Sequence, residues 1–218
     1  CIGVGGYASG PVLFMGRLLG KKIYIQEQNS YPGITNKILA KFASKIFVAY
    51  DNLHQFFNPN KIIQTGNPVR KDITTTLPNK KEACNFFQLS TDKKTILIIG
   101  GSLGAKTINE SIEKNLLQFQ QNNLQIIWQT GKVYYDGIIE RTKNIDLSSI
   151  KIQQFIREMN MAYAAADIVV SRAGALSISE LCIIGKPSIL IPSPNVSEDH
   201  QTKNAMALVT KNAAKIKK

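Results

Sequence analysis

The sequence SRAGALSISE, residues 171–180, lies between a mostly apolar run at 167–170 and another at 188–191. This order fits a strand, a tight loop, a helix and a second strand. Gly174 permits a sharp turn after the first strand, and the pattern predicts a helix over 175–184. The segment therefore predicts a β-α-β unit, from which parallel sheets with covering helices are built.

Two signals place a ligand at the start of this helix, which we expect to end at Gly185 and Pro187. The first backbone N–H groups of a helix lack partners, and the macrodipole is positive there, so the end attracts phosphate. Glu180 lies one turn further on. A carboxylate repels phosphate but accepts two hydrogen bonds from the cis-diol of a ribose. Together these signals indicate a nucleotide.

A second glycine-rich loop lies upstream. The run TILII at 95–99 predicts a buried strand, GGSLGA follows at 100–105, and apolar residues at helical spacing predict a helix over 106–119. Glycines there allow close approach to a diphosphate, and the Ser102 hydroxyl can donate a hydrogen bond. Alone, such a loop could equally be a packing turn between strand and helix. Two loops in one chain, one followed by Glu180, favour phosphate binding.

Composition and charge restrict the class of protein. The chain has 218 residues, 44% of them hydrophobic, which is enough for one or two packed domains and excludes disorder. The formal net charge of +12 favours anionic partners: nucleotide phosphates, an anionic membrane surface or nucleic acid. Lysines are scattered, without the interleaved aromatic residues of single-strand binders, so we expect no nucleic-acid partner and a largely solvated basic face.

Cysteine and carboxylate spacing gives no metal site. Cys1, Cys84 and Cys182 are far apart, and the sequence contains no Asp-x-Asp pair. We therefore expect no tightly bound cofactor or metal, and the sequence leaves room for diffusible Mg²⁺. No apolar stretch approaches the roughly 18 residues that span a bilayer, so any membrane contact would be peripheral.

Short apolar strands alternate with helical stretches, which predicts an α/β protein with parallel sheets. The predicted strands are 22–25, 45–48, 62–64, 95–99, 125–128, 151–154, 168–170 and 188–191. The predicted helices are 11–19, 34–42, 80–87, 106–119, 134–141, 159–166, 175–184 and 200–210.

A domain boundary is expected at the GNPVR segment, 66–70, which is followed by a polar, threonine-rich connector at 71–79. This division gives domains at 1–69 and 70–218. Because ligands of open parallel sheets bind at the carboxyl ends of the strands, both glycine loops should face the cleft between them. The chain starts in a glycine-rich turn without its preceding strand and ends where another strand would start, so we expect an internal fragment.

Seven segments in order resemble one family, the lipid II-forming N-acetylglucosaminyltransferases of bacterial peptidoglycan synthesis. They are GGYASGP at 5–11, EQNSYPGITNK at 27–37, GNPVR at 66–70, GGSLGAKTIN at 100–109, WQTGK at 128–132, SRAGALSISE at 171–180 and EDHQTKNA at 198–205. The resemblance covers nearly the whole chain.

The resemblance implies a GT-B glycosyltransferase with two Rossmann-like domains facing a cleft, the first one incomplete. It implies inverting transfer of GlcNAc from UDP-GlcNAc to the muramoyl 4-hydroxyl of undecaprenyl-diphospho-muramoyl pentapeptide, which converts lipid I to lipid II. The implied partners are these two substrates and the anionic inner face of the cytoplasmic membrane. The implied location is peripheral, on the cytoplasmic face of that membrane.

The resemblance also implies roles for individual residues. Glu180 would bind the ribose, Ile156 would contact uracil through its backbone, and Asn29 would line the cleft. The remaining implied substrate-binding residues are Arg70 and Ser102 at the diphosphate, Ala175, Leu176, Ser177, Ile178 and Ser179 on the donor-binding helix, His200 and Gln201 at the sugar hydroxyls, and Gly5, Gly6, Tyr7 and Ser9 in the loop for the acceptor diphosphate.

The sequence departs from the family pattern at two places. His200 stands where some relatives have Gln. The family's first glycine-rich loop, which carries a histidine, is expected upstream of Cys1, so no catalytic base is assigned and we expect this chain alone to be inactive.

Several of these residues have simpler interpretations. Glu180 could be an exposed helix carboxylate, Arg70 a linker charge, and His200 with Glu198 a surface pair or helix cap. The apolar residues Leu13, Phe14, Leu18 and Leu19 lie near Arg17, Lys21 and Lys22 and could touch a membrane, but we expect most of them to pack inside the domain.

Two other functions remain as alternatives. One is another GT-B enzyme acting on a sugar nucleotide, such as a UDP-GlcNAc epimerase or a lipid glycosyltransferase. The other is a non-enzymatic basic module that binds nucleic acid or other anions, which the net charge alone would also allow.

Overall fold

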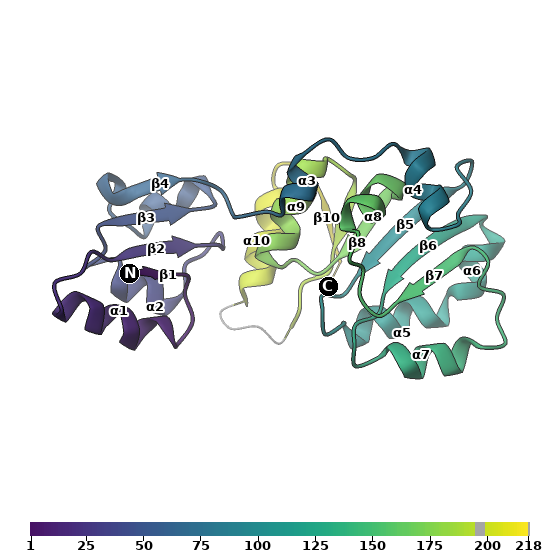
Figure 1. Cartoon of the computed structure of the whole chain (residues 1–218), viewed down its shortest axis with the longest axis horizontal. Coiled ribbons are helices and arrows are strands. Elements are labelled where there is room, and N and C mark those ends of the chain that lie inside the picture. The colour runs from purple at the N-terminus through teal and green to yellow at the C-terminus, as the bar shows by residue number, and fades with distance from the viewer. Residues whose placement is uncertain (195–198, 218) are drawn as a thin grey trace.

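The computed structural model describes residues 1–194 and 199–217. Within these residues the chain forms two parallel sheets with helices against them (Figure 1). The strand orders are β1-β2-β3-β4 and β10-β9-β8-β5-β6-β7. The predicted α/β class is therefore confirmed.

The smaller, amino-terminal sheet packs on α1 and α2. In chain order its elements are β1 (Ile2–Gly3), α1 (Ser9–Leu18), β2 (Tyr24–Glu27), α2 (Ile34–Leu39), β3 (Lys45–Val48), the 3-10 turns Asp51–Gln55 and Pro59–Lys61, and β4 (Ile62–Gln64). Its core contains Leu13 of α1, Leu39 of α2, and Ile25 and Ile46 of the central strands, each 3% exposed or less. These β-branched strand residues fit a sheet that is covered by helices.

The larger, carboxy-terminal sheet carries helices on both faces. Its elements are α3 (Lys71–Thr74), α4 (Lys80–Phe86), β5 (Lys94–Ile99), α5 (Lys106–Lys114), α6 (Leu116–Gln121), β6 (Leu124–Gln129), α7 (Tyr135–Thr142), β7 (Ile150–Gln153), α8 (Met159–Ala165), β8 (Ile168–Ser171), α9 (Ala175–Ile184), β9 (Ser188–Leu190), α10 (His200–Val209) and β10 (Lys215–Ile216).

Successive residues of β5 belong to two separate cores. Leu97 lies in the core on the side of α4, α8 and α9, whereas Ile98 lies in the core on the side of α5 and α7, together with Trp128. Successive strand side chains point to opposite faces, so a continuous apolar run is what a doubly covered strand requires. The apolar run TILII at 95–99 therefore predicted a buried strand correctly.

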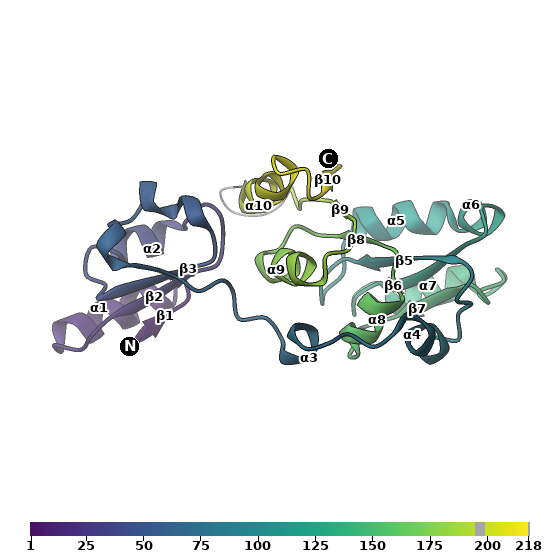
Figure 2. The same ribbon diagram turned by 90° about the horizontal axis from the view of Figure 1, so that it is seen from above.

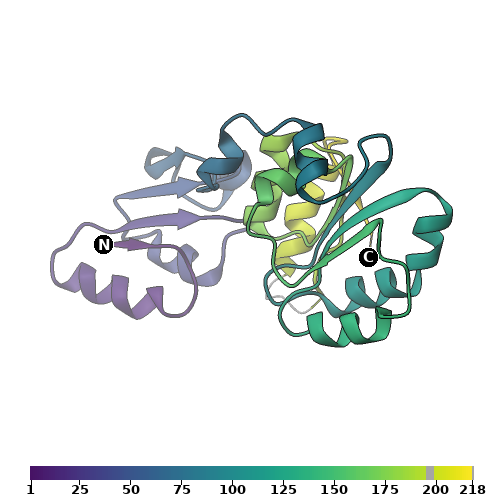
Figure 3. The ribbon, with the colours of Figure 1, turned by 45° about the vertical axis from the view of Figure 1, so that its right-hand side comes forward.

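Helices α9 and α10 lie between the two sheets (Figure 2). Viewed from another side, the strands of the amino-terminal sheet are directed toward these helices (Figure 3). Residues 65–70 run from β4 to α3 across this junction. The division of the chain at residue 69 stays a prediction.

The structure corrects three local predictions. A strand precedes the first glycine turn after all, since Ile2 and Gly3 form β1 and pair with β2; two residues are too few to give a periodic signal. The connector 71–79 begins with α3, because Ile73 is 1% exposed and anchors that turn in the core. The helix predicted over 106–119 is broken at Asn115, whose side-chain amide donates to the Ser111 carbonyl, as asparagine often does against helix continuation.

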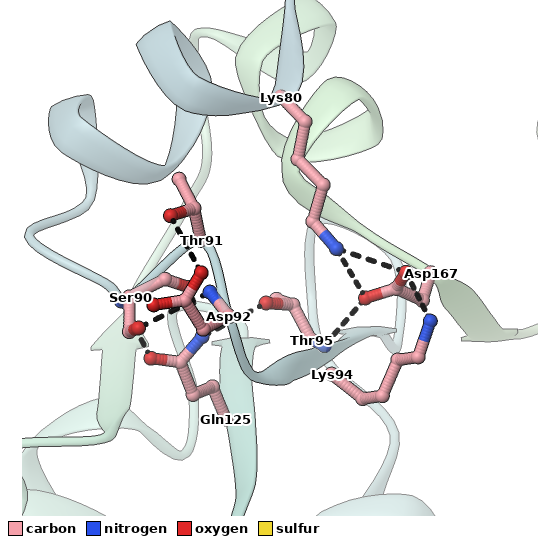
Figure 4. A network of polar contacts seen from close by, with 8 residues as sticks. All are labelled: Lys80, Ser90, Thr91, Asp92, Lys94, Thr95, Gln125 and Asp167. Carbon is pink, nitrogen blue, oxygen red and sulfur yellow. Dashed lines mark hydrogen bonds and ion pairs between the residues drawn. The ribbon is translucent and has the colours of Figure 1, made fainter.

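A partly buried polar network lies at the edge of the large sheet opposite the glycine loops (Figure 4). The carboxylate of Asp167 accepts hydrogen bonds from Lys80 Nζ at 2.8 and 2.9 Å and from the Thr95 amide at 2.9 Å, and Lys94 Nζ lies 3.4 Å away. Burial alone would raise the pKa of Asp167, but the donors from Lys80, Thr95 and Lys94 outweigh it and hold the pKa below its ordinary value. The network joins α4 to the starts of β5 and β8.

We predict that Asp167→Asn lowers the free energy of unfolding by about 1–3 kcal/mol at pH 7, because the donors of Lys80 and Thr95 lose a charged acceptor. A carboxyl group with a lowered pKa stabilises the fold above its unfolded-state pKa and ceases to do so as the pH falls through its folded-state value. The difference between wild type and variant in urea denaturation should therefore shrink in acid. Asp136→Asn, on the exposed surface of α7, is the control and should cost less than about 1 kcal/mol. A difference that grows in acid would contradict the assignment.

Candidate functional site

The loops after β5 and β6 interlock at the carboxyl edge of the large sheet. Gly104 has φ +85° and Gly131 has φ +83°, a region that favours glycine. A Cβ on Gly104 would lie 2.1 Å from the Thr130 carbonyl oxygen, and one on Gly131 would lie 2.1 Å from the Gly104 nitrogen. Only glycine fits at either position, so the backbones touch. Ser102 is exposed in the first of these loops, where its hydroxyl can meet a ligand.

The side chain of Gln129, at the end of β6, joins two loops of the candidate site. Its Nε2 donates to the Gly101 carbonyl at 3.0 Å, and its Oε1 accepts from the Ile156 amide at 2.9 Å. The backbone N–H of Ile156 is thus engaged, and the backbone contact predicted for Ile156 would use its carbonyl. The sequence analysis did not select Gln129. A polar residue at the end of a buried apolar strand could have indicated it as a site residue.

Helix α9 begins and ends where the sequence predicted. Gly174 is its N-cap and offers no side chain to the first-turn amides, and Gly185 ends it in the left-handed conformation. Ala175, Leu176 and Ser177 form the first turn, and all three are partly or fully exposed. This helix end therefore presents unpaired donors at the carboxyl end of β8, the arrangement that phosphates favour.

The predicted ribose ligand Glu180 is held by a tyrosine. The hydroxyl of Tyr163, on α8, donates to Glu180 Oε2 at 2.7 Å, and the tyrosine is 1% exposed. Burial raises the pKa of Glu180, and the hydrogen bond from Tyr163 and the charge of Arg70 only partly offset it. Glu180 is half-buried rather than an exposed helix carboxylate. Tyr163 was missed, although it is the one residue of the α8 sequence MNMAYAA whose apolar body ends in a hydroxyl.

Two residues of the predicted donor-binding helix have side chains that are engaged in core packing or in hydrogen bonds. Ile178 is 1% exposed and lies in the core, and its amide donates to the Gly174 carbonyl. The Ser179 hydroxyl donates to the Ala175 carbonyl at 3.0 Å and accepts from Asn67 Nδ2 at 3.0 Å. These two residues shape the helix and its contact with the linker, and their role in substrate binding stays a prediction.

Arg70 lies beside the same helix but already has an anionic partner. Its guanidinium donates to both carboxylate oxygens of Asp72, at 3.0 and 2.6 Å, and to the Arg157 carbonyl at 2.9 Å. The hydrogen bond to Asp72 is the main reason why the pKa of Arg70 is raised. A diphosphate that binds Arg70 would have to replace or share Asp72.

A second group of predicted residues lines one cavity at the junction of the domains. This cavity has a volume of about 260 Å³ and takes its walls from both parts of the chain. Gly5, Gly6, Tyr7, Asn29 and His200 are among its lining residues. The structure thus brings together four residues of the amino-terminal domain and His200 of α10, which the sequence separates by more than 170 positions.

Ser9 and Gln201 stabilise the loops beside this cavity rather than facing it. The Ser9 hydroxyl donates to the carbonyls of Gly5 and Gly6 at 2.8 and 3.0 Å and closes the glycine turn. The Gln201 Oε1 accepts from the Ser193 amide at 2.8 Å and fixes the loop after β9. The alternative pairing of His200 with Glu198 lies outside the described residues.

Asn67 connects the two domains in a way that its sequence position did not reveal. Its Nδ2 donates to the Gln28 carbonyl at 3.0 Å and to Ser179 Oγ, and its Oδ1 accepts from Gln26 Nε2 at 2.9 Å. One amide side chain of the linker therefore binds β2, the loop after it and α9. The GNPVR segment was predicted as a boundary, and its residue Asn67 makes hydrogen bonds to both domains.

Searches for a metal-binding cluster and a membrane-spanning helix among the described residues gave two plain results. In the ranges 1–194 and 199–217, no group of three or more His, Cys, Asp or Glu side chains could hold a metal ion. No helix in that part of the chain has the length and apolar character to cross a membrane. A larger cavity, of about 930 Å³, opens at the amino ends of β8 and β9, which is the edge opposite the one where parallel sheets bind ligands.

Comparison with known proteins gives consistent matches. The glycosyltransferase family 28 C-terminal domain matches residues 95–218, and the family's N-terminal domain matches residues 1–48. Proteins from Parabacteroides distasonis and Flavobacterium psychrophilum, both called UDP-N-acetylglucosamine–N-acetylmuramyl-(pentapeptide) pyrophosphoryl-undecaprenol N-acetylglucosamine transferase, are 57% and 55% identical over 98% of this chain. A crystal structure of Acinetobacter baumannii MurG is 32% identical over 99% of the chain, with a TM-score of 0.73.

The chain spans 57–58% of the length of these three relatives. The sequence match to the C-terminal domain covers more than half of the chain, and the GT-B architecture expected from the sequence is that of the matched crystal structure. The chain therefore belongs to glycosyltransferase family 28.

Proposed function

We propose that this chain supplies the UDP-GlcNAc site, and part of the acceptor site, of an enzyme that transfers GlcNAc to the muramoyl 4-hydroxyl of undecaprenyl-diphospho-muramoyl pentapeptide. The observation that carries the proposal is the position of Glu180. It lies within the same helix whose exposed first turn can hold a diphosphate, and Tyr163 fixes its carboxylate. A ribose and its diphosphate fit this pair. The names of the relatives support the choice of sugar and acceptor.

The chemistry follows from the charge that the reaction creates. The acceptor oxygen attacks the anomeric carbon from the face opposite UDP, the bond from that carbon to the phosphate oxygen breaks, and negative charge grows on the leaving diphosphate. The first-turn amides of α9 and the exposed hydroxyl of Ser102 are donors placed in advance for that charge. Removing one such donor in an enzyme typically costs about 2.7–4 kcal/mol of barrier. The catalytic base is not assigned to any residue of this chain.

The cavity at the domain junction is the proposed place for the acceptor diphosphate. The glycine turn of Gly5 and Gly6 forms one wall, and His200 of α10 forms another. Backbone N–H groups of glycine-rich turns can bind an anion, which is the role proposed for this turn. The reacting hydroxyl would then sit between this cavity and the donor sugar.

Helix α1 supports peripheral binding to an anionic membrane face. Contrary to the expected packing, Phe14, Leu18 and Leu19 are 48%, 64% and 69% exposed, and only Leu13 of that set is buried. The helix meets its domain along the narrow line of Leu13 and Gly16, so the other apolar side chains face outward. Arg17, Lys21 and Lys22 are exposed beside them. Apolar residues flanked by basic ones are typical of interfacial helices.

We predict that Glu180→Gln weakens UDP binding roughly tenfold. Hydrogen bonds from the ribose are worth about 1.5–3 kcal/mol to a charged acceptor and about 0.5–1.5 kcal/mol to the neutral amide, and a difference of about 1.4 kcal/mol is a factor of ten. Isothermal titration calorimetry with UDP tests this. Glu140→Gln, an exposed glutamate of α7 paired with Lys143, is the matched control and should bind UDP like the wild type. Equal UDP affinity in Glu180→Gln and wild type would remove the central assignment.

UDP binding should also depend on pH through Glu180. The ionised carboxylate accepts the ribose hydrogen bonds, and burial raises its pKa. We therefore expect the affinity to fall as the pH is lowered through that raised pKa, with a proton released on binding near it. The Glu180→Gln variant gives the background, because protonation of the diphosphate affects both proteins alike. The wild-type and variant pH profiles should differ in acid; parallel profiles would contradict the role.

Another prediction concerns membrane binding by α1. The double variant Leu18→Asp, Leu19→Asp should bind vesicles of anionic phospholipid at least roughly tenfold more weakly, because two apolar groups are lost and two negative charges are added. Sedimentation with vesicles measures it. Leu117→Asp, 62% exposed on α6, controls for a general loss of apolar surface. Vesicle binding that the α1 variant retains would place the membrane contact elsewhere.

A further inference from the structure

One face of the first turns of α10 docks on the loop that follows β2. His200, Lys203 and Asn204 are spaced i, i+3 and i+4, so they share that face. Asn204 is fully buried. Its Oδ1 accepts from the Ser30 amide at 2.9 Å and the Ser30 hydroxyl at 3.1 Å, and its Nδ2 donates to Asn29 Oδ1 at 3.0 Å.

Tyr31, the next residue of that loop, lies between cations from the two domains. The ammonium group of Lys203, on α10, is 3.4 Å from the centre of the Tyr31 ring, and that of Lys37, on α2, is 3.9 Å from it. The ring also packs edge-on against Phe56 at 5.0 Å and lies 6.4 Å from the His200 ring. The aromatic face thus attracts one lysine from each domain.

The contact requires the ring, because the two lysines repel each other and approach only where the electron-rich face of the ring offsets that repulsion. Without the ring, Lys203 would lose its attraction to the loop, and the hydrogen bonds of Asn204 would hold the start of α10 there alone. Asn29 precedes Tyr31 by two residues, and His200 precedes Lys203 by three. Both line the 260 Å³ cavity.

We propose that Tyr31 is a positioning residue. We name Tyr31, Lys37 and Lys203 together the Tyr31 clasp. The clasp sets α10 against the loop of residues 29–31 and so fixes the distance between Asn29 and His200 across the cavity. This rests on the proposed transfer function and adds to it a residue that is not among those lining the cavity. Glu180 and the loop of residues 100–105 are held by other contacts, so the clasp should affect transfer and leave UDP binding unchanged.

The test compares transfer with nucleotide binding in the full-length protein that carries this sequence. We expect Tyr31→Leu to lower kcat/KM for a muramoyl-lipid acceptor by roughly three- to thirtyfold, the effect of losing cation–π attraction. Its affinity for UDP by calorimetry should stay at the wild-type value. Lys203→Met should behave in the same way.

Conservative variants separate positioning from general packing. Tyr31→Phe keeps the ring and Lys203→Arg keeps the cation, so both should retain wild-type transfer. Tyr24→Leu is the matched control, because Tyr24 stacks on Phe47 within the amino-terminal sheet, away from α10. Thermal denaturation confirms that each variant is folded.

The outcomes distinguish the two proposals. A wild-type protein that neither binds UDP nor transfers GlcNAc would overturn the proposed function. A wild type that transfers, with Tyr31→Leu equally active, would overturn only the clasp. The clasp is also wrong if Tyr31→Phe is as defective as Tyr31→Leu, if Tyr24→Leu is equally defective, or if UDP affinity falls in step with transfer.

Discussion

Two asparagine side chains make the hydrogen bonds that hold the two sheets together across the cleft. Asn67 binds β2 and its loop to α9, and Asn204 binds the same loop to α10. Each amide uses both its donor and its acceptor. Asn204 is fully buried, so replacing it would leave buried groups unpaired, which costs more than the bond itself gains. The cavity shared by the glycine turn and His200 lies at the junction that these contacts hold together.

The loop that receives both contacts is organised by a buried carboxylate. Glu27 is 3% exposed and accepts hydrogen bonds from the Asn29 amide, the Asn29 side chain, the Gly33 amide and the Asn36 side chain, at 2.8–3.2 Å. Four donors offset much of the cost of removing a carboxylate from water. The segment EQN, residues 27–29, therefore has a structural role. Glu27 organises the loop, and the loop presents Asn29, Ser30 and Tyr31 to the other domain.

Local signals predicted much of the fold, and contacts distant in sequence account for what was missed. Gly174, Gly185 and the apolar runs on either side gave the limits of α9, and TILII gave the buried strand. The helix break at Asn115 depends on one side-chain hydrogen bond, and the two-residue strand β1 depends on its pairing with β2. Hydrophobic periodicity in the sequence indicates neither of them. The same holds for the site: glycine loops and Glu180 were visible, whereas Gln129, Tyr163, Asn67 and Asn204 act on partners 17 to 175 positions away.

The donor groups around the proposed diphosphate do not contribute equally. Arg70 already pairs with Asp72 on an exposed surface, where such a pair is worth about 0–1 kcal/mol, so a phosphate that displaces Asp72 exchanges one charged partner for another. The first-turn amides of α9 have no acceptor within the helix and no capping side chain, and only water is released when a phosphate arrives. Net stabilisation of the leaving diphosphate should therefore come mainly from the helix end. Arg70 would chiefly hold the loop that contains Arg157 beside the start of α9. This role fits a guanidinium that donates both to Asp72 and to the Arg157 carbonyl.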